Sequence, residues 1–152
     1  MPAKPLNSKE VKEIIRQIKE QWDAKDIDLN YSFFLSGKDK VYIINKEIVN
    51  YEMGNLRINS IGLYFGELVD DSLRLSIEGS QIVGKFARKN VVEVDSEIAR
   101  KWLKGEQIEI DGKELKGFVI IRHQNDFLGS GKFSQGKILN YVPKTRRIRA
   151  SD

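Results

Sequence analysis

Apolar positions near the N-terminus recur at helical spacing and predict an amphipathic helix that lies on a core. The apolar stripe consists of Val11, Ile14, Ile15, Ile18 and Trp22. Asn7 can cap the first turn, and Glu10 stands where the reciprocal carboxylate of a capping box belongs. Leu6 and Val11 hold the two positions of a hydrophobic staple, so we expect the helix to begin directly after Asn7.

Strand patterns replace the helical spacing from about residue 31. YSFFL and VYII are apolar and β-prone, and the polar SGKDK between them predicts a turn. A short helical turn is predicted at residues 46–51. SIGLYFGEL and SLRLSIEG are predicted as strands joined by a turn at residues 69–72. In the second of these segments, apolar residues alternate with polar ones as in a half-buried strand: Leu73, Arg74, Leu75, Ser76 and Ile77.

A second unit is predicted to begin at residue 89, and NVVEVD opens its first strand. A short helix at residues 96–104 can be capped by Asp95 or Ser96, and Gly105 occupies the position of a left-handed C-cap. The β segments GEQIEI, GFVIIR, FLGSGKF and KILNYV follow. We therefore expect an α+β protein, with an N-terminal α/β domain at residues 1–88 and a small mixed β-barrel at residues 89–152.

Charge is distributed unevenly between these two units. The formal net charge of +4 lies in the second unit, because residues 1–88 carry 13 basic and 13 acidic side chains. Residues 127–151 contain no acid and six basic side chains: Lys132, Lys137, Lys144, Arg146, Arg147 and Arg149. Such a run is often only a solvated tail. Its interleaved aromatic residues and glycines favour a surface that attracts a nucleic acid.

Composition excludes several classes of protein. The chain of 152 residues has no cysteine, which rules out a disulfide framework, a thiolate metal site and a thiol nucleophile. No apolar run approaches the roughly 18 to 20 residues that cross a bilayer, and the first ten residues do not resemble a signal peptide. We expect a cytoplasmic protein with no cofactor, no metal and no membrane partner. Frequent Lys, Glu and Ile favour a heat-adapted, archaeal-like protein, whereas the nine asparagines argue against heat adaptation.

Enzymatic chemistry has few candidate residues. GSGK at residues 129–132 suggests a phosphate loop, but that pattern requires glycine where Asp126 stands and Ser or Thr where Phe133 stands. The alternative is a bulge or a close backbone approach within a strand. His123 is the only histidine, and no serine stands in a nucleophile-elbow context. We therefore predict no catalytic residue.

The aromatic residues divide into two groups. Trp22 and Trp102 lie on helical apolar stripes and are predicted core residues. Phe133 and Tyr141 lie within the basic stretch, where core packing and stacking on a nucleobase are equally open interpretations.

Several segments carry a resemblance to known families. NVVEVD, SEIARKWLKGE, KGFVIIR and FLGSGKF together resemble a PUA domain, the RNA-binding module named from pseudouridine synthases and archaeosine transglycosylases. The tail GKFSQGKILNYVPKTRRIR is similar to the C-terminal RNA-binding region of Sun-type RNA cytosine-C5 methyltransferases. PLNSKEVKEII, DKVYIINKEIV and SIGLYFGEL resemble the pre-PUA domain of small ribosome-biogenesis proteins.

This resemblance implies an RNA-binding protein of rRNA or tRNA maturation. The residues that match the family tail are Gly129, Gly131, Lys132, Asn140, Tyr141, Pro143, Lys144 and Arg147. We expect phosphate contacts from Lys132, Lys137, Lys144, Arg146 and Arg147. Sugar or base contacts are expected from Asn140 and Tyr141, and close backbone approach at Gly129 and Gly131.

The chain departs from Sun-type enzymes in two respects, because it lacks the length of their cofactor domain and any cysteine. We therefore expect that it is not an enzyme and that it partners RNA, together with an RNA-modification enzyme or a pre-ribosomal protein. Two alternatives remain open. The chain could be an assembly factor with little RNA affinity, or a small enzyme with a pocket near His123.

Overall fold

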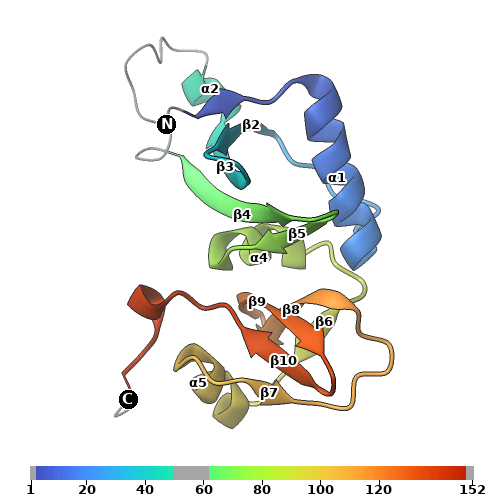
Figure 1. Ribbon diagram of the computed structural model, residues 1–152, viewed down its shortest axis with the longest axis vertical. Coiled ribbons are helices and arrows are strands. Elements are labelled where there is room, and N and C mark those ends of the chain that lie inside the picture. Colours follow the sequence, from blue (N-terminus) through green and yellow to red (C-terminus); the bar gives the residue numbers. More distant parts are fainter. Residues whose placement is uncertain (1–2, 50–61, 150–152) are drawn as a thin grey trace.

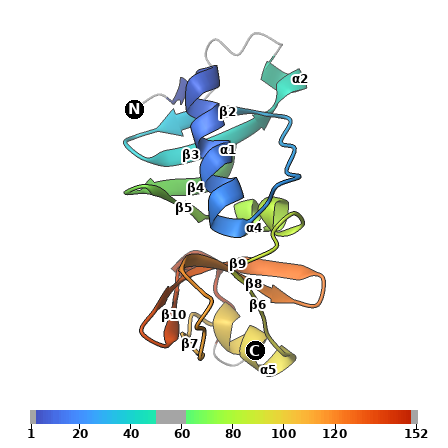
Figure 2. The same ribbon diagram turned by 90° about the vertical axis from the view of Figure 1, so that its right-hand side faces the viewer.

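The computed structural model describes residues 3–49 and 62–149. Within these residues the chain forms two five-stranded sheets that lie one above the other, with helix α4 (Ile77–Gly84) between them (Figures 1 and 2). None of the helices in this part of the chain combines the length and the apolar character needed to cross a membrane.

The first sheet is an antiparallel meander in the order β1-β2-β3-β4-β5. Its strands are β1 (Lys4–Pro5), β2 (Tyr31–Ser36), β3 (Lys40–Asn45), β4 (Leu63–Val69) and β5 (Ser72–Leu75). The predicted strands YSFFL and VYII, the described part of SIGLYFGEL and the turns that join them are confirmed, whereas SLRLSIEG is a strand only as far as Leu75. Helix α2 (Lys46–Val49) follows β3 as expected, and the rest of the predicted helical turn lies outside the described residues.

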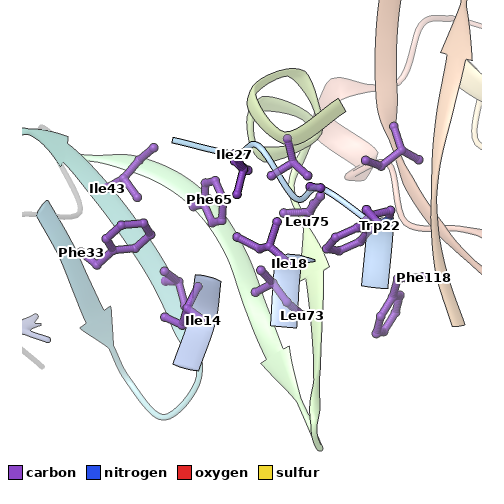
Figure 3. Close-up of a cluster of buried hydrophobic side chains, with 14 residues drawn as sticks. Ile14, Ile18, Trp22, Ile27, Phe33, Ile43, Phe65, Leu73, Leu75 and Phe118 are labelled. Atoms are coloured by element: carbon purple, nitrogen blue, oxygen red, sulfur yellow. The ribbon is translucent and has the colours of Figure 1, made fainter. Parts of the chain in front are cut away.

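Helix α1 (Ser8–Trp22) covers one face of this sheet. The predicted capping box is present: the Glu10 amide donates to the Asn7 side chain at 2.9 Å, and the Asn7 amide donates to the Glu10 carboxylate at 3.1 Å. The helix buries Ile14, Ile18 and Trp22 against the sheet (Figure 3). Burial of this apolar stripe supplies most of the stability of such a helix.

The end of α1 also protects the open edge of the sheet. The Gln21 side chain donates to the Leu73 carbonyl at 3.0 Å and accepts from the Leu73 amide at 2.8 Å. It therefore makes the pair of hydrogen bonds that a neighbouring strand would make to β5.

Helix α4 corrects the prediction of a strand that continues to residue 79. Ser76 ends the alternation because its side chain caps the helix, accepting from the Gly79 amide at 2.9 Å. A Cβ atom on Gly79 would lie 2.1 Å from the Phe65 carbonyl oxygen, so the glycine lets α4 sit directly on β4. Ile77 therefore opens a helix and does not extend the strand.

The second sheet has the order β6-β8-β9-β10-β7, with β6 parallel to β8 and the other pairs antiparallel. Its strands are β6 (Val91–Glu93), β7 (Ile108–Glu109), β8 (Gly117–His123), β9 (Asp126–Ser134) and β10 (Lys137–Asn140). Helix α5 (Ser96–Leu103) is capped by Asp95, as predicted. The sheet curls as a half-barrel in Figure 2, and within the described residues its edge strands β6 and β7 do not pair to close it.

Strand β8 contributes to two hydrophobic clusters at once. Phe118 and Ile120 belong to the cluster beneath α1, whereas Val119 and Ile121 belong to the cluster of the second sheet. Figure 3 shows Phe118 and Trp22 where the first cluster meets the second sheet. The alternation explains why GFVIIR is a continuous apolar run, since the strand is covered on both faces.

Buried hydrogen bonds reinforce the contact between the sheets. The Ser130 hydroxyl on β9 donates to the Leu75 carbonyl on β5 at 2.7 Å. The Asn90 side chain donates to the Gln21 carbonyl at 2.6 Å and accepts from the Lys116 amide at 3.1 Å. The division into domains at residues 1–88 and 89–152 stays a prediction.

We predict that Gly131→Ala destabilises the protein. A Cβ atom there would lie 2.4 Å from the Leu139 carbonyl oxygen and 2.7 Å from the fully buried Trp102 ring. Overpacking of this kind costs about 1 to 3 kcal/mol, measurable by urea unfolding. Lys132→Ala, at the next and exposed position, should change stability by less than about 0.5 kcal/mol. Equal stability of the two variants would contradict this packing.

Candidate nucleic-acid interface

The chain after β10, residues 141–149, is held against helix α5, and we call it the basic tail. It leaves β10, forms the single 3-10 turn η1 (Lys144–Arg146) and then crosses the C-terminal end of α5. The Ile148 amide donates to the Leu103 carbonyl at 3.0 Å. The tail therefore forms part of the folded surface and is not the loose solvated tail that the charge run alone also allows.

Arg147 anchors this path. Its Nε donates to the Val142 carbonyl at 3.0 Å. A Cβ atom on Gly105 would lie 2.6 Å from that same Nε, so the guanidinium lies directly on the Gly105 backbone. Gly105 has a φ of 99°, which confirms the predicted left-handed end of the helix.

Where the tail crosses α5 it lies near a second set of basic residues, which the sequence analysis missed. Arg100 and Lys101 lie in the last turn of α5, and Lys104 caps it. Lys101 pairs with Glu97 at 3.6 Å, which is an exposed contact on the same helix. The signal in the sequence was the concentration of basic residues at a helix C-terminus, where they complement the helix dipole.

Three of the predicted phosphate-binding lysines are exposed: Lys132, Lys137 and Lys144. Lys132 lies on β9, with its Nζ 5.9 Å from the centre of the Phe118 ring. Lys137 begins β10, opposite Ser134 on β9 and Glu109 on β7. These three lysines therefore lie on β9, β10 and η1, all within the second half of the chain.

The two predicted glycines serve the fold. Gly129 has a φ of 104°, a backbone conformation that glycine adopts without strain. Gly131 lies against Trp102 and the backbone of β10. Both are buried within the continuous strand β9, so GSGK is neither a phosphate loop nor the start of a helix. A close approach of RNA to these glycines stays a prediction.

Asn140, for which the sequence predicts a sugar or base contact, is hydrogen-bonded within the protein. Its amide nitrogen donates to the Trp102 carbonyl at 2.8 Å and to the Glu106 carbonyl at 2.9 Å. Its amide oxygen accepts from the Val142 amide at 2.7 Å. Both amide protons are used, so Asn140 ties the end of β10 to the end of α5.

The structure separates the two aromatic residues of the basic stretch. Phe133 packs against the core of the second sheet, whereas the Tyr141 side chain is 37% exposed. The Arg74 guanidinium lies 4.7 Å from the centre of the Tyr141 ring, and the Phe118 ring meets it edge-on at 6.2 Å. Tyr141 therefore lies at the junction of the two sheets.

Arg146 reaches the same junction. Its NH1 donates to the Glu78 carboxylate on α4 at 2.7 Å. On the neighbouring strands Arg74 pairs with Glu67. Burial raises the pKa of the Tyr64 phenol, and the charge of Glu67 adds to this effect, so the phenol stays protonated at neutral pH.

His123 lies at the end of β8, where its Nδ1 is 2.9 Å from the Val94 carbonyl oxygen. Beside it the Arg122 hydrogen bond holds the pKa of the Glu93 carboxyl below its usual range. A cleft near the tail is lined by Tyr141 and Arg146 among other residues, and His123 is not part of its lining. Across the described residues no cluster of three His, Asp or Glu could hold a metal ion.

Residues 89–148 match the family described as the methyltransferase RsmF PUA domain. The second half of this chain is therefore similar to a PUA domain. The resemblance proposed from NVVEVD, SEIARKWLKGE and KGFVIIR is confirmed, and the fold of this half agrees with it.

Curated relatives match more of the chain. The small-subunit rRNA methyltransferase F of Aeromonas salmonicida is 26% identical over 148 residues, which cover 94% of this chain and 29% of the relative. The protein of the same name from Vibrio parahaemolyticus is 27% identical over 148 residues, covering 94% and 30%. That of Vibrio cholerae is 28% identical over 92 residues, covering 60% and 20%. The chain thus spans less than a third of each relative.

These relatives correct one prediction. The absence of cysteine and of the length of a cofactor domain led us to expect that the chain is not an enzyme. That expectation is contradicted, because all three relatives are named methyltransferases. These relatives are bacterial, and the archaeal-like character stays a prediction.

We predict that Asn140→Ala lowers stability without changing RNA affinity. The variant leaves the half-buried Trp102 carbonyl without its donor and the Val142 amide without its acceptor, which costs about 1 to 3 kcal/mol. Thermal unfolding should show the loss, and RNA binding measured well below the unfolding temperature should stay within about twofold. A large loss of affinity in a fully folded Asn140→Ala protein would restore the nucleotide contact.

Proposed function

We propose that this chain is the RNA-binding part of a small-subunit rRNA methylation system. The observation that carries the proposal is the basic tail, fixed on the C-terminal end of α5 by the bond from Ile148 to Leu103 within a PUA domain. A charged segment held on a folded surface can place RNA in one orientation, which a loose tail cannot.

The exposed lysines contact phosphates. Lys132, Lys137 and Lys144 present compact positive charges on flexible stems, which suit point contacts along a backbone. Such contacts set the register of the RNA and carry little sequence information. Arg146 and Arg147 are also bonded within the protein, so they contribute to the positive field while holding the tail in place.

In this proposal RNA binding by this chain comes before methyl transfer. The relatives are named rRNA methyltransferases, and this chain corresponds to less than a third of them. In our proposal the RNA held here is presented to a methyltransferase catalytic region, either on the same polypeptide or on a partner RNA-modification enzyme. The substrate is small-subunit rRNA; a preference for tRNA is the outcome that would redirect the proposal.

Salt dependence tests the electrostatic part of this proposal. Binding to a labelled small-subunit rRNA stem-loop, followed by fluorescence anisotropy, should weaken as salt rises, with a log–log slope of about −0.7 to −0.9 per neutralised phosphate. A combined Lys132→Ala, Lys137→Ala and Lys144→Ala variant should weaken binding and reduce the slope by about 2 to 3.

A matched control removes three lysines from the outer face of α1: Lys9, Lys12 and Lys19, all exposed. This control has the same net charge as the first variant, so it isolates position from total charge. We expect it to retain most of the affinity. Equal losses in the two triple variants, or a flat salt dependence of the wild type, would contradict the proposed interface. A labelled tRNA measured in parallel tests the choice of rRNA.

A further inference from the structure

A cleft lies at the junction of the two sheets, and both halves of the chain line it. Tyr64, Arg74 and Glu78 come from β4, β5 and the start of α4. Tyr141 and Arg146 come from the segment after β10 and from η1. The cavity volume is about 130 Å³. This is room for a small planar group and excludes a double helix.

Tyr141 gives the cleft a stacking surface. Tyr141 is more than a third exposed, and the Arg74 guanidinium and the Phe118 ring contact its ring. Guanidinium planes and tyrosine rings both stack on nucleobases. A base placed against Tyr141 would extend the stack that Arg74 begins.

Arg146 gives the cleft a site for a phosphate. One of its five N–H donors is bonded to Glu78, and about half of its side chain is exposed. The carboxylates of Glu67 and Glu78 balance the charges of Arg74 and Arg146. Because these charges balance, the cleft attracts the phosphate backbone of RNA less strongly than the exposed lysines do. Carboxylates also accept hydrogen bonds from the amino groups of bases.

We infer that the cleft binds one unpaired nucleotide of the RNA, with its base on Tyr141 and its phosphate on Arg146. This inference rests on the proposed function and adds to it the kind of RNA bound. A paired base cannot enter the cleft, whereas unpaired bases can be splayed out and stacked on aromatic side chains. Because Arg74 and Glu78 precede residue 89, the site needs both halves of the chain.

Two RNA probes separate this inference from the general affinity for RNA. One is a blunt-ended hairpin, and the other is the same hairpin with a single-stranded 3′ extension of four nucleotides. Tyr141→Leu should weaken binding of the extended hairpin by about 5- to 100-fold and leave the blunt hairpin unaffected. Arg146→Ala should also weaken the extended hairpin more than the blunt one. Arg16→Ala is the matched control, because Arg16 is likewise half-exposed and paired with carboxylates, but on α1.

Crosslinking gives a readout that does not depend on a variant folding. The wild type is irradiated with the extended hairpin carrying 4-thiouridine at each extension position in turn, and the crosslinked peptide is identified by mass spectrometry. A crosslink to the peptide containing Tyr141, or to the one containing Arg74, supports the inference. Crosslinks confined to other segments, or equal losses of both hairpins in Tyr141→Leu, overturn it and leave the proposed function standing. Failure of the wild type to bind either hairpin overturns both.

Discussion

Strand β8 is the constraint on which the rest of the structure depends. Its successive residues point into different cores, with Phe118 and Ile120 beneath α1 and Val119 and Ile121 beneath α5. A shift of one residue in the register of β8 would exchange the two sets of side chains. Each set would then face the wrong hydrophobic cluster. Strand β9 pairs with β8 and lies beside α4, and residues of β9 and α4 line the cleft at the junction.

Half of the residues that match the family tail pack or bond within the protein and so build the interface. Gly131 admits Trp102, Asn140 joins β10 to α5, and Arg147 lies on Gly105. These contacts hold the tail in one place, which makes the exposed lysines and Tyr141 available at defined positions. The motif therefore has two parts: the residues above hold the interface together, and we propose that Lys132, Tyr141 and Lys144 contact RNA.

The parts of the fold that local chemistry determines could be predicted from the sequence. Helices α1 and α5 were recognised because Asn7 and Asp95 cap apolar stripes, and the buried tryptophans lie on those stripes. Helix α4 was missed because Gly79 and Gly84 lower its helical propensity and Ile77 continues the alternation of β5. The half of the cleft that lies before residue 89 could not be predicted, since Glu78 meets Arg146 only through tertiary packing across 68 residues.

The central claim is that RNA lies on the surface built from α5, the β9–β10 hairpin and the tail, and that it reaches β5 and α4 through the cleft. The most direct measurement is a titration of the ¹⁵N-labelled protein with a hairpin RNA that has an unpaired extension, followed by backbone amide signals. We expect perturbed amides to gather at residues 72–78, 96–105 and 129–149. Perturbations concentrated on the outer face of α1 or along β2 and β3 would contradict the claim.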